Sequence, residues 1–179
     1  VKSIFERYSR HLVELIRKGS QSEKEKPLEG LHIIVDAGNG AGGFFAKSVL
    51  EELGAKTEGS QFLDPDGAFP NHIPNPDNKE AMESIKKQVL AVNADYGVIF
   101  DTDVDRAAVV TGSEELLNRN NLIAVLSVIV ISEHPGTTIV TNSPTTEHLK
   151  KFIMKLGGHQ YRYISGYRNV INKAIELNN

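Results

Sequence analysis

The chain has 179 residues, of which 40% are hydrophobic and 24% are charged. This balance is typical of globular domains and excludes a disordered or fibrous protein. The formal net charge of −3 argues against a protein that binds polyanions such as nucleic acids. The absence of cysteine excludes disulfides, thiolate metal sites and cysteine nucleophiles, and it favours an intracellular location.

Apolar periodicity and the placement of glycine and proline predict the elements of the first part of the chain. They are an amphipathic helix at 2–18, a polar linker at 19–30, a buried strand with a tight glycine loop at 31–40, a helix at 44–55, a loop rich in Pro, Gly, Asn and Asp at 64–78, an amphipathic helix at 79–93, and a strand, acidic loop and second strand at 94–112. This order implies an α/β unit with a largely parallel sheet.

The same alternation continues in the second part of the chain. The predicted elements are an apolar helix at 120–132, a strand at 137–142, a helix at 145–158, a strand at 159–165 and a helix at 166–178. We therefore predict the α/β fold class, with two consecutive α/β/α units, mostly parallel sheets and a truncated second unit. The boundary is expected after Gly112, which gives domains 1–112 and 113–179. The longest apolar stretch has half the length of a membrane-spanning helix, so no membrane partner is expected.

Three carboxylates, Asp101, Asp103 and Asp105, follow a hydrophobic strand at every second position. In an extended chain this spacing puts all three on one side, at the carboxyl end of a strand, where open α/β sheets place their ligands. Three anions so close together need a cation, and oxygen ligands select Mg²⁺, Mn²⁺ or Ca²⁺. The adjoining Arg106 adds a planar cation that suits a phosphate.

The acidic loop has three other interpretations. A solvated acidic turn is disfavoured, because a strand flanks the triplet on each side and Arg106 follows directly. An EF-hand loop would need glycine and glutamate at its sixth and twelfth positions, which hold Arg106 and Gly112 instead. A haloacid-dehalogenase-type phosphatase, with Asp101 as nucleophile, stays open as an alternative, although it leaves Asp105 and Arg106 unexplained.

The segment 35–43 contains G-x-G-x-x-G, at Gly38, Gly40 and Gly43, between a predicted strand and a predicted helix. A dinucleotide site would use the helix N-terminus for the pyrophosphate, and Asp64 would be a candidate ribose ligand. We prefer the alternative that the glycines serve a tight strand-to-helix turn with close packing.

The stretch Gly166-Tyr167-Arg168-Asn169 begins the last predicted helix. A helix N-terminus with an arginine suits an anion or a sugar phosphate, although on the local pattern alone a plain helix start is preferred. The six histidines show no metal-ligand spacing and are predicted to be structural or solvated.

Taken in order, these segments resemble the α-D-phosphohexomutase family, which contains the phosphoglucomutases and phosphomannomutases. The matching segments are VDAGNGAGG, GAFPNHIPNP, DTDVDR and SGYRNVI. DTDVDR matches the family's Asp-x-Asp-x-Asp-Arg metal loop at every fixed position. The resemblance extends over residues 5–179 and corresponds to the family's second and third domains.

The resemblance implies an isomerase in which a phosphoserine donates its phosphoryl group to a hexose phosphate. The bisphosphorylated sugar then turns over, and its other phosphate returns to the serine. By this resemblance, Asp101, Asp103 and Asp105 hold Mg²⁺ against the phosphoserine, and Arg106 is a catalytic residue that contacts the phosphate. Such a role agrees with the general chemistry of phosphoryl transfer, in which a cation neutralises charge.

The hexose phosphate substrate is expected, by the same resemblance, to contact Gly166, Tyr167 and Arg168. The family's serine segment and its sugar-selecting loop do not occur in this sequence. We therefore expect a central fragment of a phosphohexomutase, whose partners are the flanking domains of the same chain, and which is inactive by itself. A non-catalytic sugar-phosphate-binding homologue is the alternative.

Overall fold

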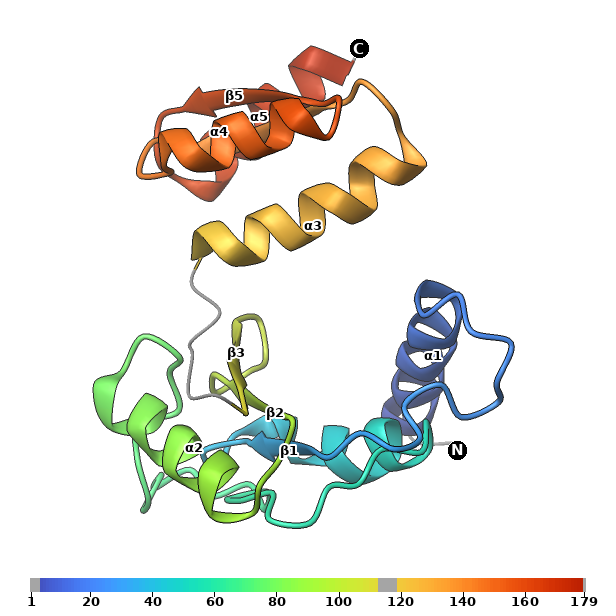
Figure 1. Cartoon of the computed structure of the whole chain (residues 1–179). Helices are drawn as coiled ribbons and strands as arrows, with labels where there is room; N and C mark the ends of the chain where they lie inside the picture. The colour runs from blue at the N-terminus through green and yellow to red at the C-terminus, as the bar shows by residue number, and fades with distance from the viewer. Residues whose placement is uncertain (1–3, 113–118, 179) are drawn as a thin grey trace. The chain divides into compact units, whose positions relative to one another are not determined.

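The computed structural model describes residues 4–112 and 119–178. The chain divides into two compact units, residues 1–116 and 117–179, and each is described by itself (Figure 1). The predicted domain boundary falls between Gly112 and Ser113. Because Ser113 lies outside the described residues, this boundary stays a prediction.

The first unit contains three strands and the helices that flank them. Its elements are α1 (Ile4–Gly19), β1 (Ile33–Asp36), a 3₁₀ turn at Ala41–Gly43, a π-wound helical segment at Ala46–Glu51, α2 (Lys79–Ala91), β2 (Tyr96–Phe100) and β3 (Ala107–Thr111). They follow the predicted order. The side chain of Asn78 caps α2 by accepting a hydrogen bond from the amide of Ala81, 3.0 Å away.

The sheet of the first unit has the order β1-β2-β3, with one parallel and one antiparallel pair. β1 and β2 are parallel and are joined through α2, as the strand–helix–strand spacing predicts. β2 and β3 are antiparallel, with Phe100 opposite Ala107, so β3 forms an antiparallel edge beside the parallel β1–β2 pair. The reason is the short connection: residues 101–106 are too few for a crossover and suffice only for a hairpin. The α/β class itself is confirmed.

Apolar side chains cover both faces of this sheet. α2 packs on one face through Ile85 and Val89, against Ile34 of β1 and Ile99 of β2. The π-wound segment covers the other face, where Ala46 and Leu50 pack with Val35 and Phe100. α1 lies outside this segment and buries Val13 against Val49 and Leu53. The helix–sheet–helix layering leaves the carboxyl ends of β1 and β2 side by side at one edge, where the candidate site lies.

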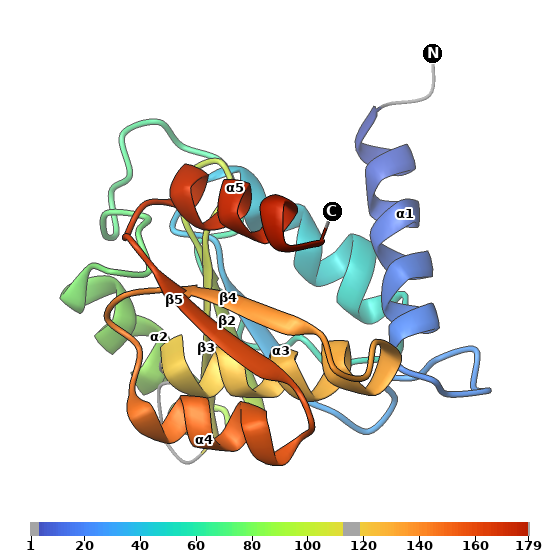
Figure 2. The ribbon, with the colours of Figure 1, turned by 90° about the horizontal axis from the view of Figure 1, so that it is seen from above.

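The second unit has one parallel strand pair. Its elements are α3 (Arg119–Glu133), β4 (Thr138–Asn142), α4 (Glu147–Lys155), β5 (His159–Tyr163) and α5 (Tyr167–Asn178). β4 pairs with β5 through the α4 crossover. Figures 1 and 2 show α4 and α5 on opposite sides of this strand pair. Ile131, Leu149 and Ile153 form its buried core.

α3 is the most apolar helix of the described chain, yet it is short. Its 15 residues span about 22 Å, less than the roughly 30 Å hydrocarbon thickness of a bilayer. Among the described residues, no helix combines the length and the apolarity that a membrane crossing requires.

Substitution of the α2 residue Ile85 by alanine tests the layered core of the first unit. Ile85 is fully buried, so Ile85→Ala is expected to lower the free energy of unfolding by about 2–5 kcal/mol. Leu90 on the same helix is half-exposed and serves as the matched control, for which we expect less than about 1 kcal/mol. Urea unfolding monitored through the amide NMR signals of β1–β3 measures both. Equal effects would contradict the packing described.

Candidate functional site

The three aspartates of the acidic loop come together at the carboxyl end of β2. One ligand oxygen from each of Asp101, Asp103 and Asp105 lies within 4.8 Å of the other two. Asp101 is buried, and the other two are exposed to solvent. The sequence thus predicted the cluster, although the reason it gave was wrong. The loop is a tight turn with Val104 at φ 67°, and it is closed by a hydrogen bond from the Asp101 amide to the Arg106 carbonyl at 3.1 Å.

Asp101 is the anchor of this loop. Its two carboxylate oxygens accept hydrogen bonds from the Arg106 amide and from the Arg106 Nε, each at 3.0 Å. Burial of the carboxylate acts to raise its pKa. The bond from the Arg106 amide, the hydrogen bond with Asp105 and the guanidinium together outweigh burial and hold the Asp101 pKa below its ordinary value. Asp101 is therefore a stable anion in the folded chain.

Crowding of like charges is visible at Asp105. Its hydrogen bond with Asp101, and then the negative charge of Asp101, raise the pKa of Asp105 above the ordinary value. The Arg106 guanidinium, whose own pKa is raised mainly by its hydrogen bond with Asp101, only partly offsets this. An added divalent cation between these carboxylates would relieve the repulsion, and carboxylate oxygens are the ligands that Mg²⁺ accepts.

Arg106 connects the acidic loop to the loop at 64–78. One terminal nitrogen of the guanidinium donates to Asn75 Oδ1 at 3.2 Å and lies 3.8 Å from Asp77 Oδ2. The side chain is nevertheless 53% exposed. The contacts orient the guanidinium while leaving it accessible to an anion in solution. Asn75 and Asp77 were not predicted as site residues, because only the fold brings them next to Arg106.

The glycine turn after β1 lies directly beside the acidic loop. The Ala41 amide donates to the Thr102 carbonyl at 2.9 Å. A Cβ atom on Gly40 would lie 2.8 Å from that same carbonyl oxygen, and one on Gly43 would overlap the Leu63 carbonyl. These contacts agree with the preferred interpretation, a tight turn in which glycine permits close packing. The main chain of Asp64, the proposed ribose ligand, accepts a hydrogen bond from Asn39 at 2.8 Å.

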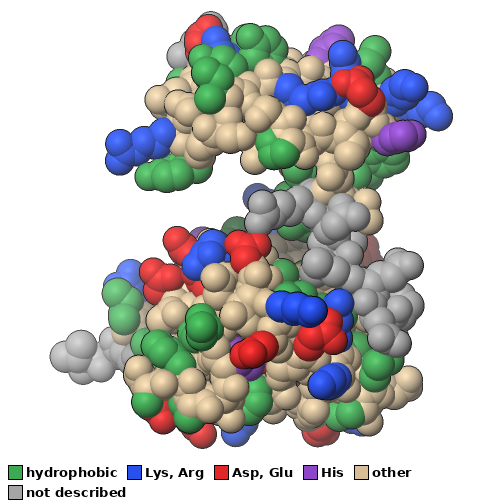
Figure 3. Space-filling view, turned by 90° about the vertical axis from the view of Figure 1, so that its left-hand side faces the viewer, with side chains coloured by type: hydrophobic (Ala, Val, Ile, Leu, Met, Phe, Trp, Pro, Cys, Tyr) green, Lys and Arg blue, Asp and Glu red, His purple; other side chains and the backbone are tan. Residues whose placement is uncertain are grey.

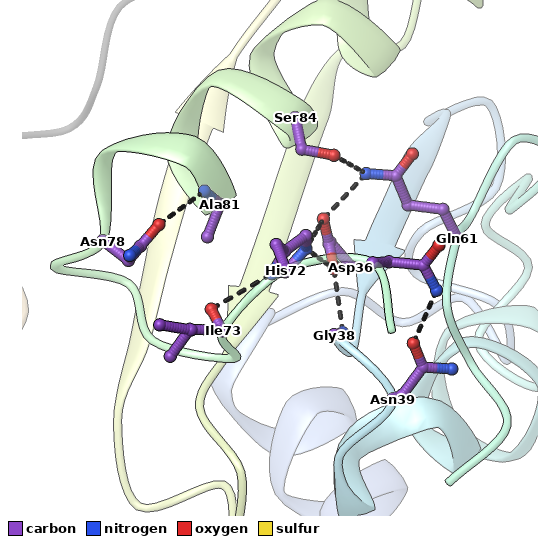
Figure 4. A network of polar contacts seen from close by, with 10 residues as sticks. Asp36, Gly38, Asn39, Gln61, His72, Ile73, Asn78, Ala81 and Ser84 are labelled. Carbon is purple, nitrogen blue, oxygen red and sulfur yellow. Dashed lines mark hydrogen bonds and ion pairs between the residues drawn. The ribbon is translucent and has the colours of Figure 1, made fainter. Parts of the chain in front are cut away.

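A buried polar network behind the glycine turn was not predicted (Figure 4). Asp36, fully buried at the end of β1, contacts the His72 ring, the Gln61 side chain and the Gly38 amide. The sequence suggested only a structural or solvated role for His72. A possible signal was the carboxylate that ends the apolar run of β1, because such a buried charge needs a partner.

The predicted substrate residues come together at the start of α5, in the second unit. Gly166 has φ 123°, a value that disfavours other residues, and Tyr167 is 72% exposed. Arg168 Nε donates to the Tyr167 hydroxyl at 3.3 Å. Asn169 donates to the Ser165 carbonyl at 3.0 Å and so closes the turn before the helix.

Two hollows adjoin this turn. An apolar cavity of about 500 Å³ lies between α3, β4 and α5 and includes Gly166 and Tyr167 in its lining. A shallow hollow of about 650 Å³ lies at the carboxyl ends of β4 and β5 and is lined by Ser143, Arg162, Tyr163, Ile164 and Ser165. Its polar groups are the Arg162 guanidinium and the hydroxyls of Ser143 and Ser165, which lie 2.9 Å apart.

Acidic and basic side chains are interspersed over the described residues of the face drawn in Figure 3. This mixture agrees with the small net charge of the chain.

Comparisons with known proteins point to one family. Residues 6–114 match the family described as phosphoglucomutase/phosphomannomutase, alpha/beta/alpha domain II. A phosphomannomutase/phosphoglucomutase from Pseudomonas syringae pv. tomato is 34% identical over 82% of this chain and 31% of its own length. A phosphoglucomutase from Neisseria meningitidis serogroup B is 30% identical over 89% of this chain and 34% of its own.

A solved structure gives the same result. The crystal structure of a phosphoglucomutase/phosphomannomutase family protein from Burkholderia thailandensis superimposes with a TM-score of 0.79 and 28% identity, covering 92% of this chain and 36% of that one. The chain therefore spans about a third of the length of the relatives it matches.

Substitution of Gly43 by alanine tests the packing of the glycine turn. A Cβ atom there would overlap the backbone carbonyl of Leu63, which cannot rotate away, so Gly43→Ala is expected to cost about 1–3 kcal/mol of unfolding free energy. Gly67 has no heavy atom within 4 Å of its would-be Cβ, and Gly67→Ala should change stability by less than about 0.5 kcal/mol. Chemical denaturation of the two variants gives the comparison. A tolerated Gly43→Ala would show that the turn is looser than described.

Proposed function

Because the chain belongs to the phosphoglucomutase/phosphomannomutase family, we propose that it forms part of an enzyme that moves a phosphoryl group within a hexose phosphate. The observation that carries the proposal is the acidic loop. Three carboxylates and an oriented, accessible arginine lie together at the carboxyl end of a strand, which is where α/β proteins bind their ligands. Such groups suit phosphoryl transfer, because catalysis there depends on positioning and on neutralising charge.

Mg²⁺ is the proposed cofactor, held by Asp101, Asp103 and Asp105. The donor set fits, since all three are oxygen ligands and their spacing lets one ion contact one oxygen from each. The hydrogen bond with Asp101, and then the negative charge of Asp101, raise the pKa of Asp105, and a cation between the carboxylates would offset that negative charge. When bound, the ion supplies positive charge against the oxygens of a phosphoryl group.

Arg106 is proposed to bind the phosphate next to that ion. Its guanidinium is fixed on one side by Asp101 and Asn75, and its exposed edge offers further N–H donors in a planar fork. Because its position is set before the phosphate arrives, little orientation is lost on binding.

The sugar phosphate is proposed to bind at the start of α5, through the backbone at Gly166 and the side chains of Tyr167 and Arg168. The amides of a helix N-terminus attract anions, and the exposed Tyr167 offers a ring face and a hydroxyl to a sugar. The shallow hollow beside this turn adds the hydroxyls of Ser143 and Ser165.

We further propose that a phosphoserine outside these 179 residues carries the phosphoryl group, and that the chain alone is inactive. The 179-residue chain, incubated with Mg²⁺ and a hexose 1-phosphate, is expected to give no hexose 6-phosphate above background in a coupled assay. A full-length relative such as the Neisseria meningitidis phosphoglucomutase, assayed in parallel, is the positive control. Robust turnover by the chain alone would contradict the need for an outside phosphoserine.

Substitution of Asp103 by asparagine tests the metal site. Asp103 is exposed, whereas Asp101 also anchors Arg106, so Asp103→Asn removes a ligand charge with little effect on the loop. We expect Mg²⁺ to bind the variant about tenfold more weakly, or more weakly still, because affinity depends on the number of charged ligands. Titration of Mg²⁺ followed by the amide NMR signals of residues 101–106 measures this. Asp64→Asn, in the adjacent loop, is the control and should bind like the parent; equal binding by Asp103→Asn would contradict the assignment.

A further inference from the structure

The strongest feature outside the proposed metal and substrate sites is the buried contact between His72 and Asp36. The side chains are 3% and 0% exposed, and His72 Nε2 lies 3.0 Å from both carboxylate oxygens of Asp36 (Figure 4). The two residues are 36 positions apart and join the end of β1 to the loop at 64–78. The contact therefore depends on the fold and holds two separate segments together.

Both ring nitrogens of His72 face oxygen atoms. Nδ1 lies 3.1 Å from the carbonyl oxygen of Ile73, which can only accept, so Nδ1 carries a hydrogen. Nε2 faces the carboxylate of Asp36 at equal distances from both oxygens, as a shared N–H donor would. A ring with two donors is an imidazolium cation.

Both carboxylate oxygens of Asp36 accept further hydrogen bonds. Its Oδ1 accepts from the Gly38 amide at 2.9 Å, and its Oδ2 accepts from Gln61 Nε2 at 2.7 Å. Gln61 also donates to Ser84 Oγ of α2 at 2.8 Å. A buried ion pair is tolerated when its polar groups have hydrogen-bond partners, and here both members have them.

The loop that His72 holds also supports Arg106. Asn75 lies three residues after His72, and Arg106 donates to its side-chain oxygen at 3.2 Å. Pro74, which lies between His72 and Asn75 in the sequence, packs against Gly38. A Cβ atom on Gly38 would lie only 2.7 Å from the Pro74 Cβ. A displacement of His72 from Asp36 would therefore be transmitted through Pro74 to the group that orients Arg106.

We propose that His72, as an imidazolium ion paired with buried Asp36, is a positioning residue that holds the loop at 64–78 so that Asn75 keeps Arg106 oriented beside the acidic loop. The significance of this positioning for catalysis rests on the proposed function of Arg106. The charge state of His72 and the coupling of His72 to Arg106 do not depend on that function, because they are properties of the folded chain.

The charge state is measured first, on the unmodified 179-residue chain. Long-range ¹H–¹⁵N correlation spectra at neutral pH are expected to show hydrogens on both ring nitrogens of His72. His11, on the exposed side of α1, should show the signals of a solvent-exposed histidine. A neutral His72, with hydrogen on Nδ1 alone, would overturn the proposal without any substitution that risks unfolding.

Asp36→Asn and His72→Gln then test the coupling. Asparagine has nearly the shape of aspartate but no charge, so His72 should become the neutral tautomer with hydrogen on Nδ1. In both variants we expect the Arg106 Nη1 hydrogens, one of which donates to Asn75, to exchange with solvent about fivefold to tenfold faster, as the loss of one supporting hydrogen bond would produce.

Arg17 Nε, which donates to the Glu25 carbonyl at 3.0 Å, is the internal control and should not change. The amides paired between β2 and β3 should stay protected, which separates a local effect from global destabilisation. His11→Gln is the matched control variant. Unchanged Arg106 exchange in Asp36→Asn would overturn the positioning role. Because none of these measurements uses catalysis or Mg²⁺, their failure is distinguishable from failure of the proposed function.

Discussion

Two adjacent parallel strands of the first unit each end in a buried carboxylate, and the surrounding structure compensates both charges. Asp36 follows the apolar residues of β1 and is 0% exposed, and Asp101 follows β2 and is 2% exposed. An uncompensated buried carboxylate is costly, so each needs a cation and several hydrogen-bond donors. Arg106 is the cation for Asp101, and the imidazolium proposed for His72 would be the cation for Asp36. The loop at 64–78 contains His72, and its Asn75 accepts a hydrogen bond from Arg106. Its Pro- and Asn-rich sequence thus performs a defined electrostatic task.

The sequence predicted that the three aspartates cluster, because this depends on neighbouring residues. Three carboxylates within five positions are at most about 13 Å apart along an extended chain, so a turn suffices to bring them together. The predicted conformation of residues 101–105 was wrong. An extended chain was expected, whereas the hairpin between β2 and β3 requires a tight turn with Val104 in the left-handed region. The pairing of His72 with Asp36 could not be predicted in this way. It joins residues 36 positions apart, and no local pattern encodes such a separation.

The elements were predicted well for a similar reason. Strand and helix periodicity, with Asn, Thr and Gly at the helix ends, is local information. Thr146 caps α4 by accepting from the Leu149 amide, and Gly157, at φ 86°, follows its end. The direction of β3 was not encoded in this information, since its apolar pattern fits either direction. Loop length decides it, because a six-residue loop joins neighbouring strands only as a hairpin.

The glycine turn shows how a familiar pattern can serve a different purpose. In a dinucleotide site, glycines let the backbone approach a phosphate and leave the amides of the following helix free to bind it. In this chain, the Ala41 amide already donates to the Thr102 carbonyl, and the missing side chain at Gly40 lets that carbonyl approach. The turn therefore binds the acidic loop in the place that a phosphate would take. Asp36 begins the turn and pairs with His72, so one segment of eight residues contacts both loops that surround Arg106. Its glycines are needed because two other backbones approach it closely, which explains the motif without a nucleotide.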